Sequence, residues 1–223
     1  PCKLRAKSDA DVCAISPAIE RDAVTLWTNA YAERLVTNGG GDKVIAAEVR
    51  RDGEQVRVEA PLFVVSCGAV NSAALLLRSK NKAHPDGLAN SSGLVGRNYM
   101  AHLATMLGAF MPPRHDTVFQ KTVAINDFYL RGPDADYPLG QIQSQGRTHG
   151  VMAQTVAPWI PLWAYDAWVS RGVDWLAMSE DLPREDNRVM VEPDGRIRLH
   201  YRPNNLVAHD RLVKETRRIL RVL

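Results

Sequence analysis

Leu62-Phe63-Val64-Val65-Ser66-Cys67 is a continuous apolar run, and Gly68-Ala69 follow it directly. A short run without alternation predicts a strand that is covered on both faces. Asn71-Ser72 then begin an apolar stretch, Ala73–Ser79, which predicts a helix. A buried strand, a turn of small residues and a helix N-terminus can together bring backbone N–H groups close to a nucleotide phosphate, because no bulky side chain blocks the approach.

A small antiparallel meander is expected before this unit. Val24–Thr28 leads into Tyr31–Thr37, and two further strand-like stretches, Lys43–Arg51 and Gln55–Ala60, are separated by Asp52-Gly53, a pair typical of hairpin turns. Apolar and polar residues roughly alternate in the second and third stretches. This alternation predicts a sheet with one face toward solvent.

The composition changes beyond residue 104, where short β-like stretches follow one another. They are Thr105–Phe110, Val118–Ile125, Gly140–Gln145, Asn187–Val191 and Ile197–Tyr201. Asp194-Gly195 between the last two is a strong hairpin signal. We interpret this part as a second domain built on an antiparallel sheet, and Ala208–Leu223 as a helix that returns to the first domain.

The predicted fold is α/β, of the mixed α+β kind. Residues 1–104 are expected to form a partial cofactor-binding domain, with the three-stranded meander and the strand–helix unit. Residues 105–207 are expected to form a substrate-binding domain, and residues 208–223 the returning helix.

The bulk properties indicate an ordinary globular chain. Its 223 residues are 45% apolar and 24% charged, and the net charge of +3 is too small to indicate a nucleic-acid partner. The three cysteines, Cys2, Cys13 and Cys67, match no metal-site spacing, and a reducing, cytoplasmic location is expected. No apolar run reaches the ~20 residues of a membrane helix. The first residue is Pro1 and the chain stops inside a helical pattern, so a fragment or a split-gene subunit is expected.

Three motifs occur in a fixed order. They are FVVSCGAVNSAALLLRS at 63–79, GLANSSGLVGRNYMAH at 87–102 and DLPREDNRV at 181–189. Together they resemble the glucose–methanol–choline (GMC) family of FAD-dependent oxidoreductases, in its bacterial sugar and alcohol dehydrogenase branch, and the resemblance covers nearly the whole chain. The family's second signature ends in Ser-Gly-aliphatic-Gly, whereas Lys80-Asn81-Lys82 follow Ser79 here. This departure loosens the subfamily assignment.

The resemblance implies FAD as cofactor and oxidation of an alcohol or sugar CH–OH group by hydride transfer to it. Gly68, Ala69 and Asn71 are the implied cofactor contacts, with a tight strand-to-helix joint without ligand as the alternative. Cys67 is expected to pack near the cofactor rather than to react. Tyr31 stands where family members place a residue whose backbone pairs with the adenine edge, or it is an ordinary strand residue.

Substrate contacts are expected in the second domain. His102 resembles a family histidine near the flavin, where an imidazole can polarise a substrate oxygen or accept a proton; a structural histidine is the alternative. Gln141 and Gln143 alternate on a polar strand and can present amides to a hydroxyl-rich ligand, or they form a polar sheet face. Trp159, Trp163 and Trp168 are candidates for stacking on a sugar ring, with a core or interface role as the alternative. No metal site is expected.

Two family features are missing from these 223 residues. There is no Gly-x-Gly-x-x-Gly turn for the FAD pyrophosphate, and the family's catalytic histidine would lie beyond Leu223. The implied partners are therefore the remaining parts of the same enzyme, an N-terminal Gly-rich FAD-binding segment and a C-terminal segment with the catalytic histidine. The alternative is a non-catalytic subunit or degenerate paralogue that keeps the fold and binds a partner or a carbohydrate. A nicotinamide-dependent enzyme is disfavoured by the absent glycine motif.

Overall fold

The computed structural model describes residues 6, 8–21, 24–110, 114, 121–146, 150–155 and 157–222. These residues divide into two units, the first within Pro1–Gly96 and Val189–Arg198, and the second within Arg97–Arg188 and Leu199–Leu223. The mixed α/β fold class with antiparallel sheets is confirmed. The functional assignment of 1–104 to the cofactor and of 105–207 to the substrate stays a prediction.

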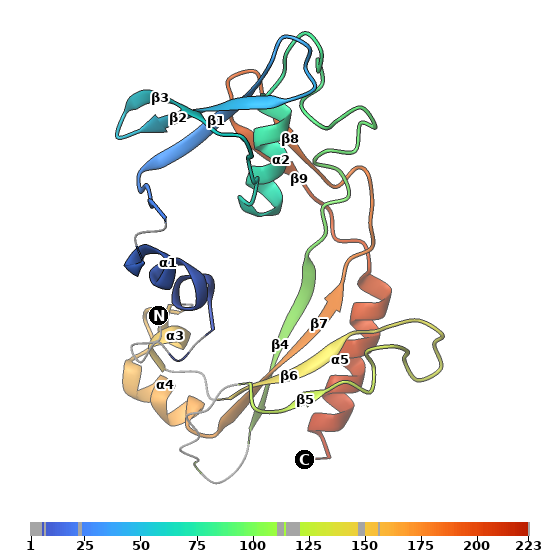
Figure 1. Cartoon of the computed structure of the whole chain (residues 1–223). Helices are drawn as coiled ribbons and strands as arrows, with labels where there is room; N and C mark the ends of the chain where they lie inside the picture. Colours follow the sequence, from blue (N-terminus) through green and yellow to red (C-terminus); the bar gives the residue numbers. More distant parts are fainter. Residues whose placement is uncertain are drawn as a thin grey trace. The chain divides into compact units, whose positions relative to one another are not determined.

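The first unit contains the predicted meander. Strands β1 (Ala30–Thr37), β2 (Val44–Arg51) and β3 (Glu54–Glu59) pair antiparallel in that order, and helix α2 (Gly68–Arg78) packs against β1 (Figure 1). A π-helical turn over Asp11–Ile15 and α1 (Ser16–Glu20) precede them. The buried core lies between sheet and helix and consists of Leu35, Ala47, Val49, Leu75 and Leu88.

Two strand predictions for this unit are wrong. Val24–Thr28 has no strand structure, and the run Leu62–Cys67 is not paired with any described strand. Phe63 and Val65 pack against the core of the unit, whereas the side chains of Leu62 and Val64 are 76% and 79% exposed. A strand is defined by its hydrogen-bonded neighbours. The described residues supply no such neighbour on either side of this run, and none of them covers the face that carries Leu62 and Val64.

Ser79 joins the end of α2 to the sheet. Its hydroxyl donates to the carbonyl oxygen of Leu75 at 2.7 Å and accepts the backbone N–H of Leu35 at 2.9 Å, and the residue is fully buried. Because a buried N–H without a partner is costly, this hydroxyl holds β1 against the helix.

We expect Ser79→Ala to destabilise the first unit by about 1–3 kcal/mol, the cost of leaving the Leu35 N–H buried without a partner. Urea unfolding followed by circular dichroism measures the loss. Ser66→Ala at an exposed position is the matched control and is expected to stay within about 0.5 kcal/mol of the parent protein. Equal stability of both variants would contradict the role assigned to Ser79.

The second unit is built on a four-stranded antiparallel sheet in the order β4-β7-β6-β5. Its strands are β4 (His102–Phe110), β5 (Ala124–Ile125), β6 (Gln141–Gly146) and β7 (Gly172–Glu180), with the short helices α3 (Gly150–Gln154) and α4 (Leu162–Val169) before β7. Residues 118–120 of the predicted strand over 118–125 lie outside the described residues. Strand β7 and helix α4 were not predicted from the sequence.

The last helix packs on this sheet. Helix α5 (Leu206–Leu220) buries Ala208 and Leu212 against Leu139, Ile142 and Ala177 (Figure 1). The expectation that the helix over 208–223 returns to the first domain is therefore corrected. The apolar side chains of α5 pack on one face of the sheet in the second unit. Without the helix, this face of the sheet would be exposed.

A two-stranded ribbon of β8 (Arg188–Val191) and β9 (Ile197–His200) turns at Gly195, as the Asp194-Gly195 pair predicted. Just before it, the buried Asn187 of the third motif binds the backbone of Arg202 twice. Its amide donates to the carbonyl oxygen at 2.9 Å and its carbonyl accepts the N–H at 2.8 Å. The motif therefore has a structural role in joining two chain segments.

The side chain of His209, on α5, faces the sheet. Its Nε2 is 2.7 Å from the hydroxyl of Thr105 and its Nδ1 is 3.2 Å from that of Ser179, and the residue is buried. Burial lowers the pKa of His209 below its usual 6.5, and the nearby Asp210 opposes this shift only partly. The neutral imidazole is thus the form that the folded unit favours.

We expect the unit to lose stability as the pH falls below about 6.5, because the unfolded chain then binds a proton that the folded His209 resists. The stability is fully present above that pH and declines toward the lowered pKa of the folded state. Urea midpoints between pH 5 and pH 8 measure the effect. A His209→Gln variant is expected to show a flatter pH profile, and an unchanged profile would contradict the assignment.

Within the described ranges, no helix combines the length and the apolarity that crossing a membrane requires.

Candidate functional site

The N-terminus of α2 is open. Gly68 begins the helix with a φ of +79°, and among the described residues no atom lies within 4 Å of the position that a Cβ on it would take. Gly68, Ala69 and Asn71 are all exposed, and no side chain caps this end of the helix in the described part of the chain. The backbone N–H groups of the first turn are therefore available to an anionic group, as the sequence predicts.

Cys67 is not buried, and its packing near the cofactor stays a prediction. It is exposed with a free thiol, and its backbone N–H donates to the hydroxyl of Ser72 at 2.9 Å. The expected burial in an apolar strand fails because the run before it lacks neighbouring strands among the described residues. The bond to Ser72 fixes the turn without occupying the N–H groups that follow Gly68.

Tyr31 lies on β1, an edge strand among the described residues. Alternate backbone groups of such a strand point away from the sheet, and a backbone contact with a ligand at this edge stays a prediction. The side chain contacts Arg78, whose guanidinium donates to the Tyr31 hydroxyl and lies 5.4 Å from the ring centre. Arg78 also donates to the carbonyl oxygen of Gly195 at 3.1 Å. Arg78 was not singled out from the sequence.

In the second unit, one face of the sheet is left uncovered by α5. Along β4 exposure alternates, so that His102 and Met106 point away from the helix while Leu103 and Thr105 point toward it. The strand register pairs His102 with Glu180, Gln141 with Met178, and Gln143 with Leu176. Directly paired residues share a face. We call this face, with His102, Met106, Gln141, Gln143 and Glu180, the open face.

The sequence-predicted substrate residues thus lie on one surface. His102, Gln141 and Gln143 come from two different strands, and the register of β7 between them places them on the open face. The amide of Gln141 also donates to the Oδ1 of Asn126 at 2.8 Å, which orients it. Glu180 is a neighbour that the sequence analysis missed, although the strand alternation predicts its face once β7 is recognised.

A cavity of 820 Å³ lies at the end of the sheet where β4 begins, and its lining combines residues of the open face with residues at the start of α5. His102, Gln141 and Glu180 line it together with the partly exposed rings of Tyr129 and Tyr137. Amide, imidazole, carboxylate and phenol groups around a concave, partly apolar wall can hold a polar organic molecule. This lining suits a ligand with several hydroxyl groups.

Asp181 also borders this cavity, and its carboxylate accepts three hydrogen bonds from the protein. It accepts the hydroxyl of Tyr201 and the backbone N–H groups of Ala101 and Asn204, each at 3.3 Å, and it is buried. The hydrogen bond to Asp181, with a smaller effect of burial, raises the pKa of Tyr201 to about 12. Both groups are therefore structural, and neither is a candidate proton acceptor.

None of the three candidate tryptophans is buried, and His84 is held by a hydrogen bond to the backbone. Trp159, Trp163 and Trp168 are largely exposed, so a core role is wrong for them. His84 binds the carbonyl oxygen of Gly41 at 2.7 Å. Where side chains are described, no three of His, Cys, Asp and Glu gather closely enough to hold a metal ion. Cys2, His115 and His149 lie outside the described residues.

Comparisons with known proteins agree with the motifs. A family model described as GMC oxidoreductase matches residues 1–104, and the N-terminal domain of that family is its flavin-binding region. The chain is 34% identical to 6'''-hydroxyparomomycin C oxidase of Streptomyces lividus over 62% of this chain and 27% of that protein. It is 30% identical to 2-methyl-1,2-propanediol dehydrogenase of Mycolicibacterium austroafricanum over 77% and 33%.

A third relative, paromamine 6'-oxidase of Streptomyces fradiae, is 36% identical over 62% of this chain and 27% of that protein. The aligned part of the chain thus spans a third or less of the length of these relatives. All three carry names of oxidases or dehydrogenases.

Proposed function

The chain belongs to the GMC oxidoreductase family, and we propose that it is part of a flavin-dependent enzyme that oxidises a CH–OH group of an alcohol or a sugar. The observation that carries this proposal is the uncapped first turn of α2 behind Gly68, which lies within the residues that the family model matches. An open helix N-terminus after a glycine of positive φ suits the pyrophosphate of a dinucleotide.

The first unit would hold FAD. Backbone N–H groups at Gly68 and Ala69 would bind its phosphates, the Asn71 amide would add a hydrogen bond, and the free backbone edge at Tyr31 would face the adenine. When bound, FAD accepts the hydride from the substrate carbon. The absence of a Cβ at Gly68 is the structural feature that fits the cofactor, because it leaves space for a close approach.

The second unit would hold the substrate. The amides of Gln141 and Gln143 can donate to and accept from hydroxyl groups, which fixes the orientation of the carbon to be oxidised. His102, on the same open face, would polarise the hydroxyl oxygen or hold its proton. The amide, imidazole and carboxylate groups that line the cavity favour a sugar or polyol over a simple aliphatic alcohol.

Two parts of the enzyme would come from further chain, since the aligned region covers 27% and 33% of the length of two relatives. We propose that a glycine-rich segment supplies the remaining cofactor contacts and that another segment supplies the catalytic histidine. The exposed side chains of Leu62 and Val64 support this view, because an element of further chain packed on this face would bury both.

The test is the intact mass of the protein isolated from its source, combined with its visible absorption spectrum and the flavin released on denaturation. We expect a mass well above that of these 223 residues and about one FAD per molecule. A colourless protein with the mass of this chain alone would contradict the proposal and favour a non-catalytic binding module.

A further inference from the structure

The charged side chains around the first cavity, that of 820 Å³, carry one sign. Its described lining includes the carboxylates of Glu180 and Asp181 but neither a lysine nor an arginine. The other titratable groups of the lining are the imidazole of His102 and the phenols of Tyr129 and Tyr137. A cleft lined by carboxylates attracts cations and repels anions. The charge of the lining therefore bears on which hydroxyl compounds the cavity accepts.

Glu180 is the last residue of β7, and it lies directly across from His102, the first residue of β4. The side chains of both residues are exposed, and in the described part of the chain neither makes a hydrogen bond or an ion pair. The backbone of Glu180 is held in place, because its carbonyl oxygen accepts the amide of Asn205 at 2.7 Å. Directly paired residues have Cβ atoms about 5 Å apart, so both side chains can reach one small ligand.

The two carboxylates of this cavity differ in their surroundings. Asp181 is buried and accepts three hydrogen bonds from the protein, as described above. Glu180 accepts none at its side chain from the described residues, so its roughly four acceptor positions are open to solvent or to a ligand. A direct contact with a bound cation is therefore assigned to Glu180.

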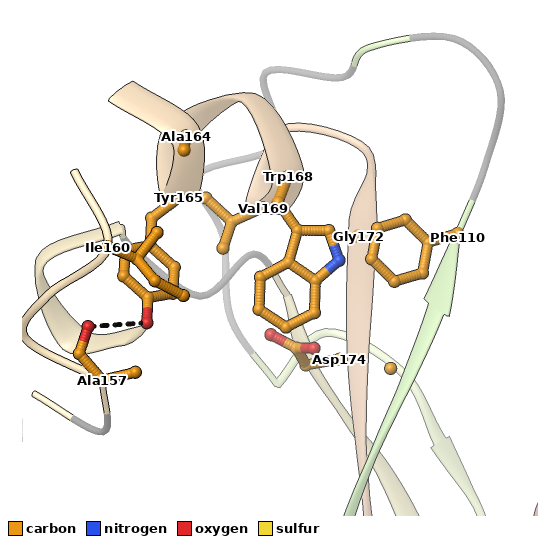
Figure 2. A pocket seen from close by; sticks show the side chains of 10 residues that line it. Phe110, Ala157, Ile160, Ala164, Tyr165, Trp168, Val169, Gly172 and Asp174 are labelled. Atoms are coloured by element: carbon orange, nitrogen blue, oxygen red, sulfur yellow. Dashed lines mark hydrogen bonds between the residues drawn. The ribbon is translucent and has the colours of Figure 1, made fainter. Parts of the chain in front are cut away.

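The second cavity of this unit lacks such a free carboxylate. It has a volume of 610 Å³ and lies between α4 and the strands β4 and β7 (Figure 2). Its wall is mainly apolar, and the rings of Phe110 and Trp168 stack there with their centres 5.6 Å apart. The one charged residue of its described lining, Asp174, already has an interaction within the protein. Available negative charge thus distinguishes the first cavity from the second.

Aromatic rings add to this preference. The guanidinium of Arg211 lies 5.5 Å from the ring centre of Tyr137, but Arg211 lines a different cavity, together with Asp134 and Glu215. Tyr129 is the other ring of the first cavity, and its side chain is 53% exposed. The face of an aromatic ring attracts an ammonium group. Tyr129 is therefore a second group in this lining that favours a cationic ligand.

A polyol that carries an amine combines these requirements. Its hydroxyl groups suit Gln141 and His102, and its protonated amine can form a charge-assisted hydrogen bond with Glu180. An acidic polyol would instead meet a carboxylate of its own charge. We propose that the substrate class of this cavity is amino sugars and amino polyols, with the ammonium group held by Glu180. This inference rests on the proposed function, because it names the substrate class of the same site.

Three matched probes test the proposal on the complete protein: glucamine, glucitol and gluconate. They share a hydroxylated carbon chain, and at neutral pH one end carries an ammonium, a hydroxyl or a carboxylate group. Binding is measured by ligand-observed NMR. We expect glucamine to bind about tenfold more tightly than glucitol, with gluconate weakest, as a charge-assisted contact predicts. Equal affinity for glucamine and glucitol would overturn the proposal.

Two variants locate the contact. Glu180→Gln keeps the size of the side chain and removes its charge, and it is expected to weaken glucamine binding about tenfold while changing glucitol binding by less than about twofold. Glu54→Gln is the matched control, because Glu54 is also exposed at the end of a strand but belongs to the first unit. It changes the net charge equally and is expected to leave all three affinities unchanged. Equal weakening of glucamine binding in both variants, or an undiminished preference for glucamine in Glu180→Gln, would refute the contact.

The measurement separates this inference from the proposed function, because binding is observed without turnover. A protein that contains flavin and binds glucamine and glucitol equally would overturn the substrate class alone. A colourless protein would overturn the proposed function, and with it the inference that depends on it.

Discussion

Replacing Gly140 by alanine is expected to prevent the second unit from folding, or to destabilise it by about 4 kcal/mol or more, which places it among the most severe single substitutions. A Cβ on Gly140 would lie 2.0 Å from the backbone oxygen of Met178, a distance that no relaxation of a side chain can relieve. The φ of +134° is also a conformation that only glycine adopts readily. Strand β6 would have to separate from β7 at the entrance to the first cavity.

Gly195→Ala is the control that measures the cost of backbone strain alone, without the steric clash expected for Gly140→Ala. Gly195 also has a positive φ, +83°, but no atom of the described residues lies within 4 Å of its Cβ position. Its replacement is expected to cost about 1–2 kcal/mol, the cost of the left-handed conformation alone. Thermal unfolding and the yield of soluble protein measure both variants. Similar stability of the two would show that β6 and β7 do not approach as closely as described.

Much of the fold follows from local patterns in the sequence. The meander over β1 to β3 and the hairpin at Gly195 were predicted because alternation and Asp-Gly pairs are short-range signals. Strand β4 was also predicted from alternation. Its apolar and polar residues alternate because one of its faces packs on α5 while the other face is open. These elements need no knowledge of distant segments.

The elements that were missed depend on distant neighbours. Strand β7 lies between β4 and β6 and is partly covered on both faces, so Gly172–Glu180 shows no clean alternation. The run at Leu62–Cys67 has the composition of a central strand but has no partner strand among the described residues. Composition predicts how a segment would be buried, and only the surrounding chain decides whether it is.

The candidate site was predictable in part. The alternation of Gln141 and Gln143 predicts a shared face, but their place beside His102 depends on β7, which the sequence did not reveal. The contact between Tyr31 and Arg78 joins residues 47 positions apart, and no local pattern signals it. A helix was predicted over Ala73–Ser79 behind a turn at Gly68-Ala69, and α2 in fact begins at Gly68 itself.

Gly68→Leu is expected to remove flavin from the protein. The side chain would project into the space that lies open at the N-terminus of α2, where the proposed phosphate contacts require a close approach of the backbone. The loss of one or two charge-assisted hydrogen bonds, each contributing about 1.5–3 kcal/mol, corresponds to at least a tenfold to hundredfold lower affinity for FAD. The backbone strain of the substitution must be separated from this effect.

Gly53→Leu provides that control. Gly53 has a φ of +90° in the turn between β2 and β3, and no described atom lies within 4 Å of its Cβ position, so the strain is matched at a site away from α2. The decisive measurement is the FAD content of the complete protein for the parent and the two variants, from the absorbance of flavin released on denaturation. We predict near-stoichiometric FAD in the parent and in Gly53→Leu, and little in Gly68→Leu. Equal FAD content in the two folded variants would contradict the assignment of the α2 N-terminus to the flavin nucleotide.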